Sequence, residues 1–395
     1  MRVLLAHNFY RSSAPSGEDV VYRNERSLLE RNGVEVVPFE RFNDDLDDST
    51  FAKRVRLARE CVWSIDTYAA LQDIIRTTRP DVAHFHNTFP QISPSAYAAC
   101  KDLGMPVVQT LHNFRLICPG ALLLRNGLPC EECASGALLP ALRNRCYRNS
   151  LLATIPVAWM LYRNRRRGIY ASQVDRYIAL TRFAREKFGS SVLPADRISV
   201  RPNFLADPPT PGEGRGGYVV YVGRLSEEKG VLPLLAGWRY LPDVPLKIVG
   251  DGPLRGRMEE AARQGGMNVE FLGYRGNAEA VGIVREALLS VLPSLCYESF
   301  PLTVVESYAC GTPVVASRIG SLAEIVRDGV TGASVRPADP ADLASTVRGL
   351  LEDPGRLSEL RGNSRREFES LYAPERALDT LLEIYRDVQR GRIPR

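Results

Sequence analysis

The stretch "CYESFPLTVVESYACGTPVVAS" (residues 296–317) predicts a loop, a short helix and a buried strand in succession. Pro301 marks the start of the helix, an unbroken helix-compatible run follows it, and Gly311 marks its end. The run "PVVAS" (313–317) is rich in β-branched residues and favours a strand. A helix that leads into a buried strand is typical of a parallel sheet covered by helices, so the segment indicates an α/β fold.

The same alternation of short β-branched runs and longer helical patterns extends along the whole chain of 395 residues. This length is large for one core, so we expect two βα domains of similar size. Ligands of open parallel sheets bind beyond the carboxyl ends of the strands, and two such domains facing across a cleft would hold a substrate between them. The predicted strands are 2–7, 34–40, 82–86, 106–112, 176–181 and 197–204 in the first half and 218–223, 245–250, 269–273, 289–294, 313–317 and 332–335 in the second.

The predicted boundary between the domains is the segment "LADPPTPGEGRGG" (205–217), which has three prolines, four glycines and no apolar periodicity. We therefore predict an N-terminal domain at 1–204 and a C-terminal domain at 218–372. The last segment, 373–395, contains an amphipathic helix that could pack on either domain.

The formal net charge of +5 is mild but unevenly placed, because residues 140–170 carry seven arginines and no acid. The opening "MRVLLAHNFYRSS" (1–13) lacks the apolar region and cleavage site of a secretory signal and indicates a first buried strand. The apolar run "LLATIPVAWMLY" (151–162) is shorter than the roughly 18 residues that a spanning helix needs. These features predict a cytoplasmic protein.

Two glutamates, Glu298 and Glu306, flank the start of the predicted helix in the opening stretch. The first-turn N–H groups of Leu302 and Thr303 would have no intrahelical acceptor, and the helix dipole adds positive charge there, so this end suits a phosphate. A nucleoside diphosphate sugar fits the layout, with Glu298 accepting from hexose hydroxyls and Glu306 from the ribose diol. In the alternative interpretation Glu298 is a surface-loop residue and Glu306 a solvated helix residue.

A second stretch, "YVGRLSEEKG" (221–230), places Arg224 and Lys229 at the carboxyl end of the first strand of this domain. Neighbouring strand ends converge on one crevice, so both cations could neutralise the diphosphate. In the alternative, they pair with the adjacent Glu227 and Glu228.

These motifs resemble family 4 of the retaining glycosyltransferases. The resemblance rests on "GRLSEEKG" (223–230), "GDGP" (250–253), "FLGY" (271–274), the E-x7-E spacing of the opening stretch, and a Gly and Glu at Gly320 and Glu324. It implies the GT-B fold, with two Rossmann-like domains, and a final helix that crosses back to the N-terminal domain.

The resemblance also implies the roles of individual residues. Arg224 and Lys229 would bind the donor diphosphate, Glu298 would contact the donor sugar and Glu306 the ribose, and backbone around Tyr274 would hold the base. The helix start completes the expected donor set with Phe300, Pro301, Leu302 and Thr303.

In the N-terminal half, the loop within "FYRSSAPSGEDVVYRNE" (9–25) places Gly17 at the mouth of a helix predicted at 20–33 and ending at Gly33. Family members often have two adjacent glycines in this loop. Here Ser16 takes the place of the first, so the implied approach to the donor phosphate rests on Gly17 alone.

All four histidines, His7, His84, His86 and His112, fall at the ends of predicted strands. The "HFHN" pair resembles a metal site, but ordinary packing satisfies many histidines that share a strand face. By resemblance, His112 corresponds to a family histidine that contacts the donor sugar near its anomeric carbon, which makes it and Glu298 the catalytic candidates. The alternative role for His112 is a cap on the strand–helix turn.

Retention of configuration could use Glu298 as a covalent nucleophile. We favour front-face departure, in which Arg224, Lys229 and the helix N-terminus stabilise the leaving diphosphate and the phosphate takes the acceptor's proton. No catalytic metal is expected, and the acidic run "NDDLDD" (43–48) is interpreted as solvated charge.

Four cysteines, Cys118, Cys130, Cys133 and Cys146, have a spacing that suits a closed tetrahedral zinc site within an insertion at about 113–150. Some family members carry a similar insertion. Any such zinc would be structural, and the alternative is four unrelated thiols. The remaining cysteines are predicted to be ordinary core residues: Cys61, Cys100, Cys296 and Cys310.

The arginine-rich segment 143–167 could lie on the inner membrane surface with the face of Trp159 and Met160 down, which would suit a lipid-linked acceptor. The alternative is a helix with an apolar core face and solvated arginines. Nucleic acid binding is not expected, because the patch lacks interleaved aromatics.

The sequence thus predicts a retaining hexosyltransferase that uses a nucleotide sugar donor and a saccharide or lipid-linked acceptor, with a role in cell-surface polysaccharide synthesis. A nucleotide-sugar 2-epimerase is a rival with the same fold. The rival from another class is a catalytically silent nucleotide-sugar-binding partner of another transferase.

Overall fold

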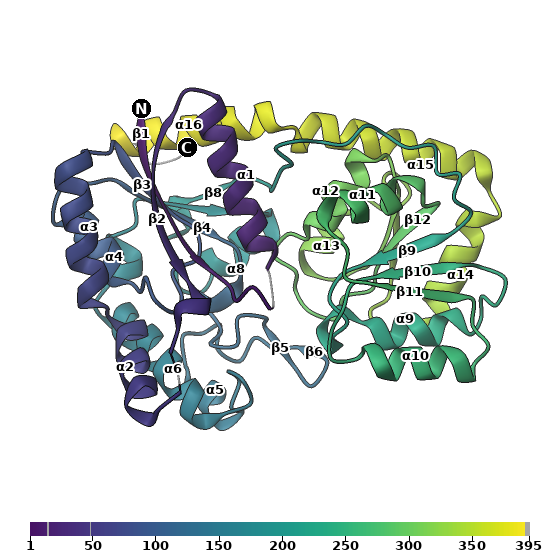
Figure 1. Ribbon diagram of the computed structural model, residues 1–395, viewed down its shortest axis with the longest axis horizontal. Coiled ribbons are helices and arrows are strands. Elements are labelled where there is room, and N and C mark those ends of the chain that lie inside the picture. Colours follow the sequence, from purple (N-terminus) through teal and green to yellow (C-terminus); the bar gives the residue numbers. More distant parts are fainter. Residues whose placement is uncertain (14–15, 48, 392–395) are drawn as a thin grey trace. The chain divides into compact units, whose positions relative to one another are not determined.

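The computed structural model describes residues 1–13, 16–47 and 49–391 (Figure 1). Residues 14, 15 and 48 belong to the predicted Gly17 loop and the acidic run 43–48, and 392–395 end the predicted last segment; all of these lie outside the described residues. The chain divides into two compact units. Unit 1 comprises Met1–Leu123, Cys130–Ala206 and the segment from Pro374, and unit 2 comprises Leu124–Pro129 and Asp207–Ala373.

Unit 1 is built on a six-stranded parallel sheet with the order β2-β1-β3-β4-β7-β8, in which the winding direction changes between β1 and β3. Leu29 of α1 and Leu381 and Tyr385 of α16 pack on buried strand residues, so these two helices cover one face. The strands are β1 (Arg2–Phe9), β2 (Glu35–Phe42), β3 (Val82–Phe85), β4 (Val107–Leu111), β7 (Arg176–Ala179) and β8 (Ile198–Val200). The helices are α1 (Gly17–Arg31), α2 (Phe51–Val62), α3 (Ile65–Thr78), α4 (Ser95–Lys101), α5 (Leu139–Arg143), α6 (Leu151–Arg166), α7 (Ile169–Ser172), α8 (Arg182–Gly189) and α16 (Pro374–Gln389).

Unit 2 has a second six-stranded parallel sheet, with the order β11-β10-β9-β12-β13-β14 and a change of winding direction between β9 and β12. Helices lie on both of its faces (Figure 1), with α9, α10 and α14 in one core cluster and α11 in the other. The strands are β9 (Val219–Val222), β10 (Leu246–Val249), β11 (Val269–Gly273), β12 (Leu289–Leu292), β13 (Val314–Ser317) and β14 (Gly332–Val335). The helices are α9 (Val231–Trp238), α10 (Arg255–Gln264), α11 (Asn277–Glu286), α12 (Leu302–Ala309), α13 (Gly320–Ile325), α14 (Pro340–Leu351) and α15 (Pro354–Glu367), and a two-stranded antiparallel hairpin is formed by β5 (Leu124–Arg125) and β6 (Leu128–Pro129).

Every predicted strand is present, although several are shorter than predicted, and the prediction of two parallel-sheet Rossmann-like domains is confirmed. The predicted helix 20–33 begins earlier and ends earlier, as α1. The Ser16 side chain accepts from the N–H of Glu18, and Ser16 with Asp19 forms a capping box. This local hydrogen bonding starts the helix at Gly17, which an apolar pattern alone does not reveal.

Residues 207–217, in the predicted linker, contain no helix or strand and follow the surface of unit 2. The N–H of Gly212 donates to the carbonyl of Cys310, and that of Gly216 donates to Glu286, both at 2.9 Å. A Cβ atom at Gly212 would lie 2.1 Å from the carbonyl oxygen of Arg285. Glycine here therefore permits a close backbone approach as well as supplying flexibility.

The structure of α6 shows that one part of the predicted membrane face, the pairing of Trp159 with Met160, is wrong. Trp159 is 53% exposed, whereas Met160 is only 4% exposed. Neighbouring residues on an α-helix are separated by about 100° around its axis, so these two side chains cannot share a face. Among the described residues, no helix combines the length and the apolar character that would carry it across a bilayer.

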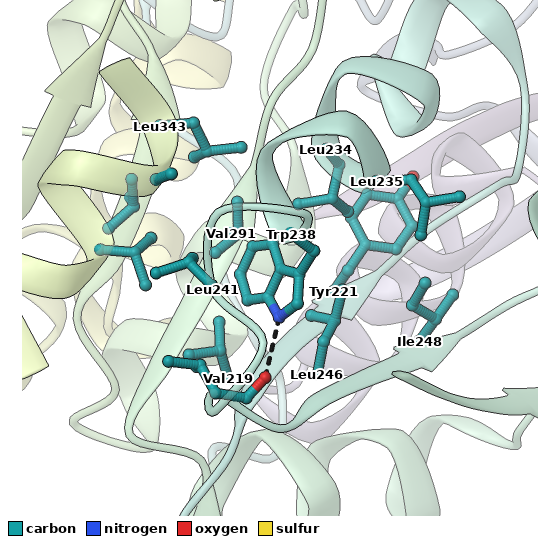
Figure 2. Close-up of a cluster of buried hydrophobic side chains, with 14 of the residues drawn as sticks. Val219, Tyr221, Leu234, Leu235, Trp238, Leu241, Leu246, Ile248, Val291 and Leu343 are labelled. Carbon is teal, nitrogen blue, oxygen red and sulfur yellow. Dashed lines mark hydrogen bonds between the residues drawn. The ribbon is translucent and has the colours of Figure 1, made fainter. Parts of the chain in front are cut away.

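The core of unit 2 is centred on Trp238, the last residue of α9, which is fully buried among aliphatic side chains from strands and helices (Figure 2). Its indole N–H donates to the carbonyl of Val244 at 3.0 Å. The large ring fills the core and its one polar atom is satisfied, so both parts of the side chain contribute to stability.

We predict that Trp238→Ala destabilises the protein by about 3–5 kcal/mol, because the substitution leaves a large cavity and an unpaired carbonyl. Urea unfolding followed by circular dichroism measures this. The control is Tyr240→Ala, two residues away on a side chain that is 62% exposed, and it should stay within about 0.5 kcal/mol of the wild type. Equal stability of all three proteins would contradict the packing described for this core.

Candidate active site

The loops that follow β9 and β12 meet at the switch point of the unit 2 sheet, which is the place between these two strands where the winding direction changes. Lys229 lies after β9, and its Nζ is 2.6 Å from Oε1 of Glu298, which lies after β12. The hydroxyl of Ser294 donates to the same oxygen at 2.7 Å. The side chain of Glu298 is only 12% exposed, so the interpretation of Glu298 as a free surface-loop residue is wrong.

Two glycines allow close backbone contacts with the loop after β9, one contact with the loop after β12 and one with the loop after β10. Gly230 has a φ of +68°, and a Cβ there would lie 1.8 Å from the carbonyl oxygen of Pro293 in the loop after β12. Gly250 has a φ of +135°, and its Cβ would lie 1.9 Å from the carbonyl oxygen of Gly223. Both positions need glycine for conformation and for space, which explains their place in the "GRLSEEKG" and "GDGP" motifs.

The predicted cations differ in their surroundings. Burial alone would lower the pKa of the Lys229 ammonium, but the carboxylate of Glu298 outweighs this and leaves the pKa raised. Arg224 is exposed, and its guanidinium makes no hydrogen bond or ion pair with the described part of the chain. Lys229 is therefore held as a cation in a fixed place, Arg224 remains available to a ligand, and the alternative pairing with the adjacent glutamates is wrong for Lys229.

Helix α12 begins directly after this ion pair. Pro301 occupies its N-cap position, no side chain caps the helix, and the N–H groups of Leu302 and Thr303 donate no backbone hydrogen bond to described residues. Phe300 is 7% exposed, and its ring packs on Tyr372 with centroids 5.7 Å apart. The buried ring anchors the loop while the helix end keeps its donors, which is the arrangement that suits an anion.

Glu306 lies one turn into α12 and is partly buried. Burial raises the pKa of its carboxyl, although the side-chain amide of Asn277, which donates to Oε1 at 2.7 Å, opposes the shift. The interpretation of Glu306 as a merely solvated residue is therefore wrong. Tyr274, which follows β11, is 69% exposed and has free surface for a ligand.

Unit 1 contains a buried polar cluster around Glu25, a residue of α1 with no exposed surface. Its Oε1 lies 2.9 Å from Nδ1 of His84 and 2.9 Å from Nε2 of His86, and its other oxygen bonds to the guanidinium of Arg201. Burial opposes ionisation of Glu25, but Arg201 and the two imidazoles outweigh it and lower its pKa well below the ordinary value. Glu25 is therefore a carboxylate that accepts from His86 and Arg201 and lies against the imidazole of His84.

His112 is attached to this cluster through His86, with His86 Nδ1 and His112 Nε2 2.8 Å apart. Burial lowers the pKa of His86 to about 4 and that of His112 well below its ordinary value, so both rings are neutral near neutral pH. Because Glu25 only accepts, His86 donates through Nε2 and accepts through Nδ1, and His112 donates through Nε2. The Nδ1 atom of His112 is then free of a proton and can accept from a hydroxyl.

A small pocket lies beside His112 within unit 1. Its wall includes Glu18, Asn113, Arg115 and Met160. Asn113 donates to Glu18 at 2.8 Å, so a carboxylate is held at the start of α1. This carboxylate and the Ser16 capping box oppose the binding of a phosphate at Gly17, and that contact stays a prediction.

The histidines His84 and His86 share a strand face, as predicted, and with Glu25 they form the one group of potential metal ligands within 4.8 Å among the described residues. These three side chains are close together because they hydrogen-bond and not because they bind a metal, since Arg201 already supplies the positive charge that an ion would bring.

The four cysteines predicted to bind zinc, all in the described part of the chain, do not form such a group of ligands. The thiols of Cys118, Cys130 and Cys146 influence the pKa of Cys133, which burial raises to about 11. The zinc site stays a prediction.

Comparison with known proteins agrees with the two-unit architecture. Residues 16–206 match the family described as Glycosyltransferase Family 4, and residues 216–353 match Glycosyl transferases group 1. The chain is built from two glycosyltransferase domains. These two matches support a GT4-like glycosyltransferase, which is the coarser part of the prediction. That the E-x7-E motif and the cysteine-bearing insertion are features of the family stays a prediction.

A glycogen synthase from Mycobacterium tuberculosis (strain CDC 1551 / Oshkosh) is 34% identical to this GT4-like chain over 179 residues, which are 44% of the chain and 43% of the relative. The match thus spans less than half the length of that relative. Sucrose-phosphate synthase from Thermosynechococcus elongatus superposes with a TM-score of 0.72 and 19% identity, covering 99% of each chain. Anabaena HepE in complex with UDP and glucose superposes with a TM-score of 0.64 and 17% identity, covering 97% of this chain and 98% of HepE. These likenesses confirm the predicted GT-B fold.

Sequence reasoning missed four side chains that hold the candidate residues of this GT4-like chain in place. Ser294 and Asn277 bind the two motif glutamates, and Glu25 and Arg201 support the histidines. Glu25 had a signal, because it stands at helical spacing between the buried Val21 and Leu28 on the core face of α1. The other three carry no such signal in one sequence.

We predict that acidification destabilises the protein through His86. Its pKa is about 4 when folded, against an ordinary value of about 6.5, so the unfolded chain binds the proton more readily and stability is lost as pH falls from about 6.5 toward 4. Between about pH 7 and pH 5, His86 alone should cost roughly 2 kcal/mol in the free energy of unfolding.

Urea unfolding at both pH values, with an NMR titration of the histidine ring protons, measures this effect. His86→Gln removes the titrating group and should reduce the pH dependence by the same amount. A folded His86 that titrates near about pH 6.5 would contradict the neutral hydrogen-bond chain.

Proposed function

We propose that this chain transfers a hexose from a nucleoside diphosphate sugar to a hydroxyl of a saccharide or lipid-linked glycan and retains the anomeric configuration. The observation that carries the proposal is the constellation at the unit 2 switch point. There a partly buried Lys229–Glu298 pair lies beside an uncapped helix start, and a second carboxylate, Glu306, lies one turn further on.

Each part of this constellation suits one part of such a donor. Lys229, the exposed Arg224 and the N–H groups at the start of α12 supply positive charge and donors for a diphosphate. A carboxylate oxygen of Glu298 can accept hydrogen bonds from hexose hydroxyls, and a carboxylate oxygen of Glu306 can accept them from the ribose diol. Tyr274 offers exposed surface near the strand ends for the base.

The proposed reaction is a front-face displacement. The bond from the anomeric carbon to the diphosphate oxygen breaks, and its electron pair leaves with the diphosphate. The acceptor oxygen bonds to the anomeric carbon on the same face, and its proton passes to the leaving phosphate. Lys229, Arg224 and the helix end stabilise the growing negative charge, so electrostatic stabilisation is the main contribution of the protein. No metal takes part in the proposed step.

The roles of His112 and the donor's identity are also proposals. The neutral His112 ring, with a proton-free Nδ1, suits a hydrogen bond from a sugar hydroxyl, and its place in the reaction rests on the family resemblance. HepE holds UDP and glucose, which makes UDP-glucose the first donor to test. A role in polysaccharide synthesis in the cytoplasm is part of the same proposal.

The test begins with thermal shifts against UDP-, GDP- and ADP-sugars, since the correct donor stabilises the folded state by mass action. With that donor, Glu298→Gln should lower kcat by about 100-fold or more, the effect of losing one preorganised electrostatic group, with little change in nucleotide affinity. Lys229→Met should weaken nucleoside diphosphate binding about 10- to 100-fold, because a charged hydrogen bond to phosphate is lost.

The matched control is Glu227→Gln, an exposed position in the same loop, which should behave as the wild type. Unchanged turnover in the Glu298→Gln variant would reject the role given to Glu298. A wild-type protein that binds the donor and transfers nothing to any acceptor or water would favour the silent binding partner instead.

A further inference from the structure

The outward face of α6 is apolar. Leu152 is 79% exposed, Ile155 45%, Trp159 53% and Tyr162 45%. Their spacing of three and four residues places them on one side of the helix, and the rings of Trp159 and Tyr162 stack with centroids 5.5 Å apart. These four residues form a continuous exposed stripe, which is called the α6 stripe here.

The opposite side of the same helix is apolar as well, and it is used by the fold. Val157, Met160 and Leu161 are buried there. A helix that is apolar all round is normally buried all round, whereas half of α6 faces solvent. The core therefore explains only one face, and the α6 stripe is an apolar surface without a structural use in unit 1.

Positive charge surrounds the α6 stripe. Five of the seven arginines in 140–170 are exposed: Arg143, Arg145, Arg148, Arg166 and Arg167. Arg166 lies over the ring of Tyr162 at 5.8 Å, so a guanidinium borders the stripe directly. The helix α2, which packs against α6, adds exposed Phe51 and Val55 and further basic residues.

We propose that the α6 stripe docks on an anionic membrane surface, with its apolar residues among the acyl chains and its arginines at the lipid phosphates. Trp and Tyr are the aromatic residues favoured at such an interface, and arginines near it are attracted by anionic lipid. A second copy of the chain is a poorer partner, because the same five exposed arginines would face each other without an acid between 140 and 170. This docking does not depend on the sugar chemistry proposed above.

The test is co-sedimentation of the full chain with vesicles of phosphatidylcholine alone and of equimolar phosphatidylcholine and phosphatidylglycerol. The wild type should bind the anionic vesicles, bind the neutral ones at least about 10-fold more weakly, and lose affinity as salt rises. Leu152→Ser with Trp159→Ser should weaken anionic binding by about 10-fold or more. Arg166→Gln and Arg167→Gln should each weaken it by about five-fold.

Ile65→Ser is the matched control, since Ile65 is an exposed apolar residue (74%) of the same unit at the start of α3, and it should bind as the wild type does. Circular dichroism and thermal midpoints equal to the wild type show that the variants are folded. Absence of wild-type binding to anionic vesicles overturns the proposal. So does a dimer in sedimentation velocity that the Leu152 and Trp159 substitutions dissociate while vesicle binding is unchanged, because the stripe would then be an interface between copies.

Discussion

The ion pair between Lys229 and Glu298 is the interaction on which the candidate site of unit 2 depends. The change of winding direction between β9 and β12 brings their loops together, and the positive φ of Gly230 lets the backbone approach Pro293 in the loop that carries Glu298. Removal of either partner leaves the other charge partly buried and unpaired, which is costly. The pair thus holds the loop after β12 at the start of α12, where the free N–H groups lie.

Unit 1 uses a buried charge in the same way. Glu25 joins α1 to the sheet through His84 and His86, and the hydroxyl of Tyr385 in α16 lies 2.7 Å from His84 Nδ1. A buried carboxylate of this kind is tolerated because Arg201 and two imidazoles satisfy it. The same hydrogen bonds fix the protonation of His112, so the cluster that docks the last helix also prepares the candidate active-site ring.

Much of this architecture could be predicted from the sequence, because it depends on local patterns. Runs such as 313–317 favour buried strands, and the E-x7-E spacing places Glu298 and Glu306 on either side of a helix start. The partners of those residues could not be predicted, because they come from distant elements: Ser294 and Asn277 reach the glutamates only through the folded sheet. The start of α1 was misplaced because a capping box, rather than apolar periodicity, decides it. Met160 was assigned to the exposed face, although it is buried. Which face of an apolar helix becomes buried depends on the elements that pack against it, and these cannot be identified from the sequence.

A crystal structure with a bound nucleoside diphosphate is the most direct test of the central claim, that an uncapped helix end and a fixed ammonium in unit 2 bind the donor's phosphates. The account predicts a phosphate oxygen within hydrogen-bond distance of Lys229 Nζ and of an N–H at Leu302 or Thr303, with the ribose beside Glu306. A nucleotide bound elsewhere on the chain, or one bound there without contact to Lys229 and the start of α12, would contradict it.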